Sequence, residues 1–125
     1  MKSWAMVVIG GGVGSACRHA VNRWAVHRFE NSVPLATGIV NIAGCAIIGT
    51  LAGLIAGGRL RMDPSIRTLV FVGLLGGFTT FSSFGLDTLT LVHEGRRWVA
   101  IGNVLIQVGL GVVLVFGGYW LGSSR

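Results

Sequence analysis

The residues that could do chemistry in this sequence gather in one stretch, Gly76–Phe84, which reads GGFTTFSSF. Each glycine weakens a helix interior by about 1 kcal/mol relative to alanine, and serine and threonine hydroxyls compete for backbone hydrogen bonds. A helix broken here would free carbonyl oxygens, which are hard ligands suited to a small cation. The alternative is an intact helix whose hydroxyls bond the carbonyl four residues back.

Other polar or aromatic residues could contact an ion. Phe81 and Phe84 are three residues apart and share a helix face, and the positive ring edge attracts anions weakly, although packing alone also explains them. Asn41 could line a pore with its amide donors or join two helices by a hydrogen bond. Arg18 could attract anions or extend to lipid headgroups. Gln107 could face the same cavity as Asn41.

No arrangement of residues predicts catalysis, so we expect no enzyme. The histidines, His19, His27 and His93, lie at or beyond the ends of apolar runs. Cys17 and Cys45 fall inside apolar runs without a metal-binding motif, and we interpret both as packing residues. No carboxylate lies deep in an apolar run.

The elements that position these residues are predicted to be membrane helices. The chain has 125 residues, of which 52% are hydrophobic and 11% charged, a composition typical of membrane proteins. We predict an all-α integral membrane protein with one domain over residues 1–125 and the third of its four transmembrane helices broken. The spans are expected at about 4–26, 33–57, 68–91 and 98–122. A signal peptide in residues 1–17 is the alternative for the first span.

Glycine pairs four residues apart recur in every predicted span, and such pairs let helix backbones approach closely in lipid. They predict a tightly packed bundle, and the short loops predict antiparallel contacts between consecutive helices. The pairs are Gly10/Gly14, Gly49/Gly53, Gly53/Gly57, Gly73/Gly77 and Gly118/Gly122.

The basic residues give no preferred orientation. With four spans, five lie on the side of the termini and five on the other, whereas orientation follows an asymmetry of Lys and Arg. We therefore expect insertion in both orientations and pairing as an antiparallel homodimer; the alternative is that one arginine dominates. The two sets are Lys2, Arg59, Arg61, Arg67 and Arg125, and Arg18, Arg23, Arg28, Arg96 and Arg97.

The formal net charge of +6 does not indicate nucleic-acid binding. The basic residues lie mostly between apolar runs, where lipid phosphates are the expected partner. No basic face is interleaved with aromatic residues, as a nucleic-acid site would require.

At this point the chain resembles bacterial fluoride channels of the Fluc/CrcB family over nearly its whole length. The resemblance rests on residues 10–18 (GGGVGSACR), residues 37–44 (TGIVNIAG) and above all Gly76–Phe84. It implies a multi-pass protein of the cell inner membrane that exports cytoplasmic fluoride passively, to relieve fluoride toxicity. The implied assembly is an antiparallel dual-topology homodimer with two pores.

The resemblance also implies roles for individual residues. One structural sodium ion would be held at the dimer centre by the backbone carbonyls of Gly76 and Thr79 from each chain. Phe81 and Phe84 match the paired pore phenylalanines, Asn41 the pore asparagine and Arg18 the vestibule arginine. Ser82 and Ser83 fall on the polar track beside the pore.

The sequence departs from the family pattern in two places. Residues 109–115 lack the Ser or Thr that members often carry deep in the fourth span, which puts a hydroxyl contact to the ion there in doubt. Gly85 replaces a common serine. The rival function is a small dual-topology multidrug exporter, which would need a carboxylate midway along the first span; residues 4–17 contain none.

Overall fold

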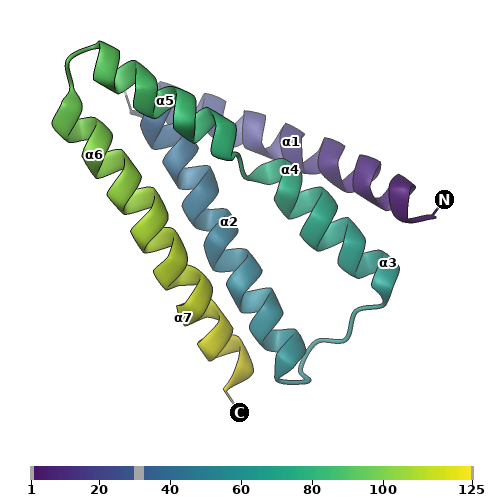
Figure 1. The fold of residues 1–125 in the computed structure, drawn as a ribbon. Coiled ribbons are helices and arrows are strands. Elements are labelled where there is room, and N and C mark those ends of the chain that lie inside the picture. The colour runs from purple at the N-terminus through teal and green to yellow at the C-terminus, as the bar shows by residue number, and fades with distance from the viewer. Residues whose placement is uncertain (1, 30–32, 125) are drawn as a thin grey trace.

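The computed structural model describes residues 2–29 and 33–124, and all regular structure within them is helical. Four long rods follow one another along the chain, with ends close to the predicted ranges (Figure 1). The third rod is interrupted after Phe78. The elements are α1 (Lys2–Arg28), α2 (Val33–Ala56), α3 (Pro64–Arg67), the π-helical η1 (Thr68–Leu75), α4 (Gly76–Phe78), α5 (Phe81–His93), α6 (Arg97–Leu105), the π-helical η2 (Ile106–Leu110) and α7 (Gly111–Ser123).

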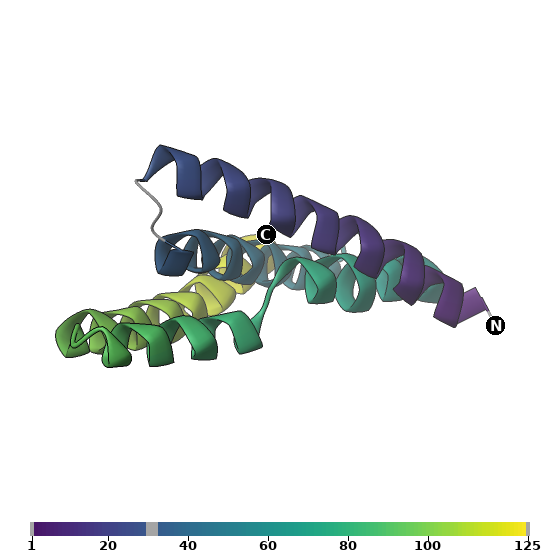
Figure 2. The ribbon, with the colours of Figure 1, turned by 90° about the horizontal axis from the view of Figure 1, so that it is seen from above.

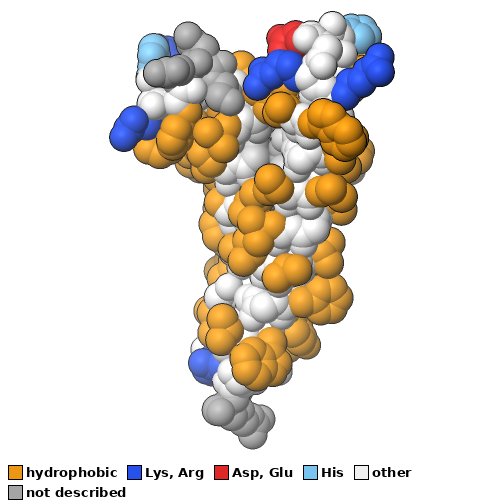
Figure 3. All heavy atoms as spheres, turned by 90° about the vertical axis from the view of Figure 1, so that its left-hand side faces the viewer, with side chains coloured by type: hydrophobic (Ala, Val, Ile, Leu, Met, Phe, Trp, Pro, Cys, Tyr) orange, Lys and Arg blue, Asp and Glu red, His pale blue; other side chains and the backbone are white. Residues whose placement is uncertain are grey.

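Among the described residues, three helical segments are long and apolar enough to cross a membrane: Val33–Ala56, Pro64–His93 and Arg97–Ser123. The segment α1 is equally long, but Arg18 and Arg23 interrupt its apolar run. On the face drawn in Figure 3, apolar side chains cover the middle and the charged ones lie toward the two ends. Trp4, Trp98 and Trp120 are exposed near helix ends, as in the aromatic belts of membrane proteins.

Glycines decide which helices pair. A Cβ atom on Gly10 would lie 2.5 Å from the carbonyl oxygen of Leu69, and one on Gly77 would lie 2.5 Å from that of Gly11. These contacts join α1 to η1 and α4, and Gly53 and Gly122 join α2 to α7 in the same way. The predicted tight packing through glycine pairs is therefore confirmed.

The most extensive contacts join the first rod to the third and the second to the fourth. Residue numbers rise together across both interfaces, so each pair is parallel. The expected contacts between consecutive helices are present for α1 with α2, α2 with α5 and α5 with α6, but they are the smaller ones. The physical reason is that the matching glycine stripes lie on alternate rods. Seen from above, the chain steps sideways between α4 and α5 (Figure 2).

Two side chains of the connection between α2 and α3, Arg59 and Asp63, bind free backbone groups at helix ends. Asp63 Oδ1 accepts hydrogen bonds from the Ser65 and Ile66 amides at 2.8 and 3.0 Å, which caps α3. Arg59 donates to the carbonyls of Leu121 and Gly122 at 3.0 and 2.8 Å, which satisfies free carbonyls at the end of α7.

We predict that Gly49→Val destabilises the fold, because its Cβ would lie 2.7 Å from the Val115 Cα. Overpacking of this kind costs about 1–3 kcal/mol, and more where the backbone must move. Gly109→Val is the matched control, since nothing lies within 4 Å of a Cβ there. Thermal unfolding in detergent, followed by circular dichroism, should show a lower midpoint for Gly49→Val only. Equal midpoints for the two variants would contradict the close α2–α7 packing.

Candidate functional site

The third rod is broken by two consecutive residues in extended conformation. Thr79 has φ −83° and ψ 158°, and Thr80 has φ −151° and ψ 115°. The predicted break is therefore present, within the predicted stretch Gly76–Phe84. The alternative of hydroxyls bonding the carbonyl four residues back is realised at one residue, Thr79, whose hydroxyl donates to the Leu75 carbonyl at 3.0 Å. That bond lies beside the break without preventing it.

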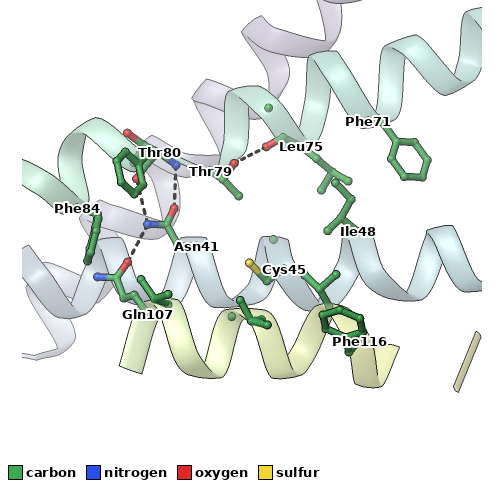
Figure 4. A pocket seen from close by; sticks show the side chains of 17 residues that line it. Asn41, Cys45, Ile48, Phe71, Leu75, Thr79, Thr80, Phe84, Gln107 and Phe116 are labelled. Atoms are coloured by element: carbon green, nitrogen blue, oxygen red, sulfur yellow. Dashed lines mark hydrogen bonds between the residues drawn. The ribbon is translucent and has the colours of Figure 1, made fainter. Parts of the chain in front are cut away.

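Asn41 of α2 replaces the helical partners that Thr80 loses. The Thr80 N–H donates to Asn41 Oδ1 at 2.8 Å, and Asn41 Nδ2 donates to the Thr80 carbonyl at 3.0 Å (Figure 4). Buried backbone groups need such partners, and Thr80 is only 8% exposed. Of the two interpretations of Asn41, the structure supports the hydrogen bond between helices.

The side chain of Thr80 starts the second half of the rod. Its hydroxyl oxygen accepts the Ser83 amide at 3.3 Å and caps α5. The same hydroxyl donates to Ser83 Oγ at 3.1 Å and lies 3.3 Å from Ser82 Oγ. The predicted polar residues Ser82 and Ser83 are thus brought together around Thr80.

The carbonyls around the break have different environments. The Thr80 N–H would bond the Gly76 carbonyl in a continuous helix, but it donates to Asn41, which releases the Gly76 oxygen. From α1, Ser15 donates to the Gly77 carbonyl at 3.4 Å and the half-buried Arg18 donates to the Thr79 carbonyl at 3.3 Å. Arg18 therefore lies at the break, directed at the backbone.

A chain of amides extends from the break along the fourth rod. Asn41 Nδ2 also donates to Gln107 Oε1 at 2.8 Å, and Gln107 Nε2 donates to Asn103 Oδ1 at 2.8 Å. Asn103 Nδ2 donates to the hydroxyl of Thr88 at 3.0 Å, and that hydroxyl donates to the Phe84 carbonyl at 2.8 Å. The chain joins α2, α6 and η2 to Thr80 at the break and to α5.

A cavity of about 490 Å³ opens beside the break. Its walls are apolar apart from four side chains, which belong to Asn41, Thr79, Thr80 and Gln107. Phe81 and Phe84 lie at one end with ring centroids 5.4 Å apart and planes inclined by 47°. Phe84 is 8% exposed, whereas Phe81 is 81% exposed.

The structure brings most of the predicted site residues to one place. Asn41, Gly76, Thr79, Phe81 and Phe84 line the cavity. The remaining three, Arg18, Ser82 and Ser83, contact the break without appearing in the cavity wall.

The predicted site did not include Thr80 or Asn103, and the role of Gln107 was left open. The sequence did contain a signal for Asn103 and Gln107. They are four residues apart in an otherwise apolar run, so their amides share one helix face. The hydrogen bond between them occurs as that spacing allows.

A helix interrupted beside a cavity, with its free backbone groups bound by another helix, defines a class of membrane protein with a polar site at membrane depth. The chain matches the family described as "CrcB-like protein, Camphor Resistance (CrcB)" over residues 5–119. The chain belongs to this family.

Curated relatives match the chain over nearly its full length. A protein of Methylobacillus flagellatus is 42% identical over 118 residues, covering 94% of this chain and 88% of its own length. One of Paracoccus denitrificans is 43% identical over 122 residues, covering 98% and 95%. One of Chloroflexus aurantiacus is 37% identical over 122 residues, covering 98% and 96%. All three are named "Fluoride-specific ion channel FluC".

Proposed function

We propose that this protein is a fluoride channel, a multi-pass protein of the inner membrane through which cytoplasmic fluoride leaves down its gradient. The observation that carries the proposal is the identity of 42–43% with two relatives named as fluoride-specific channels, over at least 94% of the chain. The function is passive conduction, with no catalytic step. The exporter alternative finds no support, because the described helix α1 contains no carboxylate.

The site chemistry suits a small anion that holds its water tightly. A selective pore must replace that water with fixed donors, and each contact must be weak enough to release the ion. The cavity wall carries two amide and two hydroxyl side chains and four phenylalanine rings, Phe81 and Phe84 among them, whose edges carry partial positive charge. Modest contacts in series satisfy both requirements.

An antiparallel dimer of the same chain would complete the site. The cavity of the single chain is open and its wall includes two exposed rings, Phe81 at 81% and Phe116 at 72%. A second copy would cover them, and the equal numbers of basic residues on the two sides favour opposite orientations. In this arrangement α1 also crosses the membrane, as the first of four spans, and Arg18 stays at the break.

Reporters fused to the C-terminus test the orientation. A reporter active only in the cytoplasm and one active only outside it should both give signal if the chain inserts both ways. Signal from one reporter alone would exclude insertion in both orientations. Because the reporters do not measure conduction, fluoride tolerance is measured on the same cells.

Of the two carbonyl oxygens proposed to bind the sodium ion, that of Gly76 is free and that of Thr79 is partly engaged. The Gly76 carbonyl is released from the helix and Gly76 lies in the cavity wall, as a hard oxygen ligand for a small cation requires. The Thr79 carbonyl already accepts the Arg18 guanidinium at 3.3 Å, so one of its lone pairs is engaged. With both chains contributing, these carbonyls would hold the ion and join the two copies.

We predict that Gly76→Val weakens the dimer without unfolding the chain. Within one chain, the nearest atom to a Cβ on Gly76 is the Phe71 carbonyl oxygen at 3.9 Å, so the added side chain fits the monomer and projects toward the proposed partner. Gly85→Val is the control, because nothing lies within 4 Å of its Cβ. Size-exclusion chromatography with light scattering, with sodium present or replaced, should show dissociation only for Gly76→Val. An unchanged dimer would contradict the proposed ion site.

Fluoride tolerance tests the function in cells. Expression in a bacterium deprived of its own fluoride exporter should raise the fluoride concentration at which growth stops. Tolerance to cationic dyes should stay unchanged, which separates the channel from a multidrug exporter. Unchanged fluoride tolerance, with the protein present in the membrane, would contradict the proposal.

A further inference from the structure

The orientation of the Asn41 amide is fixed by the backbone of one residue. The Thr80 N–H can only donate and the Thr80 carbonyl can only accept, so Oδ1 of Asn41 must face the former and Nδ2 the latter. The second Nδ2 proton points to Gln107 Oε1 at 2.8 Å. Both N–H groups of Asn41 are therefore engaged within the chain.

The orientation of the Asn41 amide determines the orientations of the Gln107 and Asn103 amides. Because Asn41 presents an N–H, Gln107 must turn its oxygen toward Asn41 and its nitrogen away. One proton of Gln107 Nε2 then donates to Asn103 Oδ1 at 2.8 Å. The other proton has no acceptor among the described residues. In Figure 4 this nitrogen lies on the side away from Asn41, next to Phe84.

The other polar donors in the cavity wall are engaged. The Thr79 hydroxyl donates to the Leu75 carbonyl, and the Thr80 hydroxyl donates to Ser83 Oγ. The Cys45 thiol is only a weak donor. Gln107, which is 8% exposed and lines the same cavity, thus carries the one strong side-chain donor left free in the described wall.

We propose that Gln107 is the amide that donates a hydrogen bond to the conducted anion, and that Asn41 is a positioning residue that sets the direction of the Gln107 amide. The inference rests on the proposed fluoride conduction and specifies its donor. It also gives a reason why this chain conducts without a hydroxyl in residues 109–115: the donor on the fourth rod is an amide at 107.

The chain allows a direct test because Gln107 is its only glutamine. Protein labelled with ¹⁵N at the glutamine side chain, in lipid nanodiscs, should give one pair of Hε resonances. Sodium fluoride should move one of the two protons downfield in a saturable way, since hydrogen bonds to anions are short and strong. Sodium chloride at the same ionic strength should leave both in place. No fluoride-dependent shift, at concentrations where the wild type conducts, would overturn the inference.

Measurements of fluoride efflux test the donor role of Gln107 independently. Gln107→Met keeps a similar length without a donor and should reduce fluoride efflux from proteoliposomes by about tenfold or more, from the loss of a hydrogen bond to a charged group. Leu110→Met, on the same rod outside the cavity wall, is the control and should conduct like the wild type. Efflux by Gln107→Met within about twofold of the wild type would overturn the donor role. A wild type that conducts no fluoride would instead overturn the proposed function.

Discussion

Asn41→Asp is expected to reduce fluoride efflux about a hundredfold or more. An aspartate at this position has no N–H to give to the Thr80 carbonyl or to Gln107 Oε1, the two acceptors that Asn41 now satisfies. Leaving two partly buried acceptors unpaired costs about 3 kcal/mol in total, which is roughly a hundredfold in rate if the conducting geometry is lost. The new negative charge beside the cavity also repels an anion.

Two further variants separate these causes. Asn41→Leu removes the hydrogen bonds without adding charge, and we expect its efflux to lie between those of the wild type and Asn41→Asp. Ser3→Asp places the same charge at the exposed start of α1 and should keep most of the efflux. Efflux by Asn41→Asp within a few fold of the wild type, measured with a fluoride electrode on proteoliposomes of matched protein content, would contradict the role of Asn41 at the break.

The second large effect is expected from the phenylalanine pair. Phe81→Ile and Phe84→Ile should each reduce fluoride efflux at least about tenfold, because isoleucine has no positive ring edge to offer an anion. The centroids of the two rings lie 5.4 Å apart in the cavity wall. Each variant therefore removes one of the two ring edges that we propose contact the anion.

Folding and assembly must be separated from conduction in this experiment. Phe81 is 81% exposed in the single chain but would be covered in the proposed dimer, so assembly of Phe81→Ile is checked by size-exclusion chromatography. Phe84 is buried, and we expect a loss of about 1–2 kcal/mol in unfolding free energy. Phe29→Ile removes a ring that packs on Trp24 at the end of α1 and is the control. Normal efflux in both Phe81→Ile and Phe84→Ile would exclude the rings from the pathway.

Much of the fold could be predicted from local composition. Long apolar runs bounded by charges predicted the helix ranges, and the glycines and hydroxyls of Gly76–Phe84 predicted the break, because both effects act within a few residues. Which rods pair could not be predicted from loop length. It depends on which glycines of separate helices lie against each other, as Gly10 and Gly73 do.

The roles of the predicted site residues stay predictions, but the structure shows how they are connected. Asn41 lies against the break through hydrogen bonds to Thr80, and these bonds join residues 39 apart in the chain. The sequence alone left the Asn41 amide free to serve either as an anion donor or as a link between helices. The backbone of Thr80 decides this, because it determines which way the amide faces and hence which donor remains free on Gln107.

Fluoride efflux from liposomes measures directly whether this chain conducts fluoride. Liposomes loaded with potassium fluoride and containing the purified protein are diluted into fluoride-free buffer, with valinomycin to carry the compensating potassium. A fluoride electrode should record rapid release that protein-free liposomes lack, and liposomes loaded with chloride should show much slower chloride release. Fluoride release no faster than from protein-free liposomes would show that the chain is not a fluoride channel.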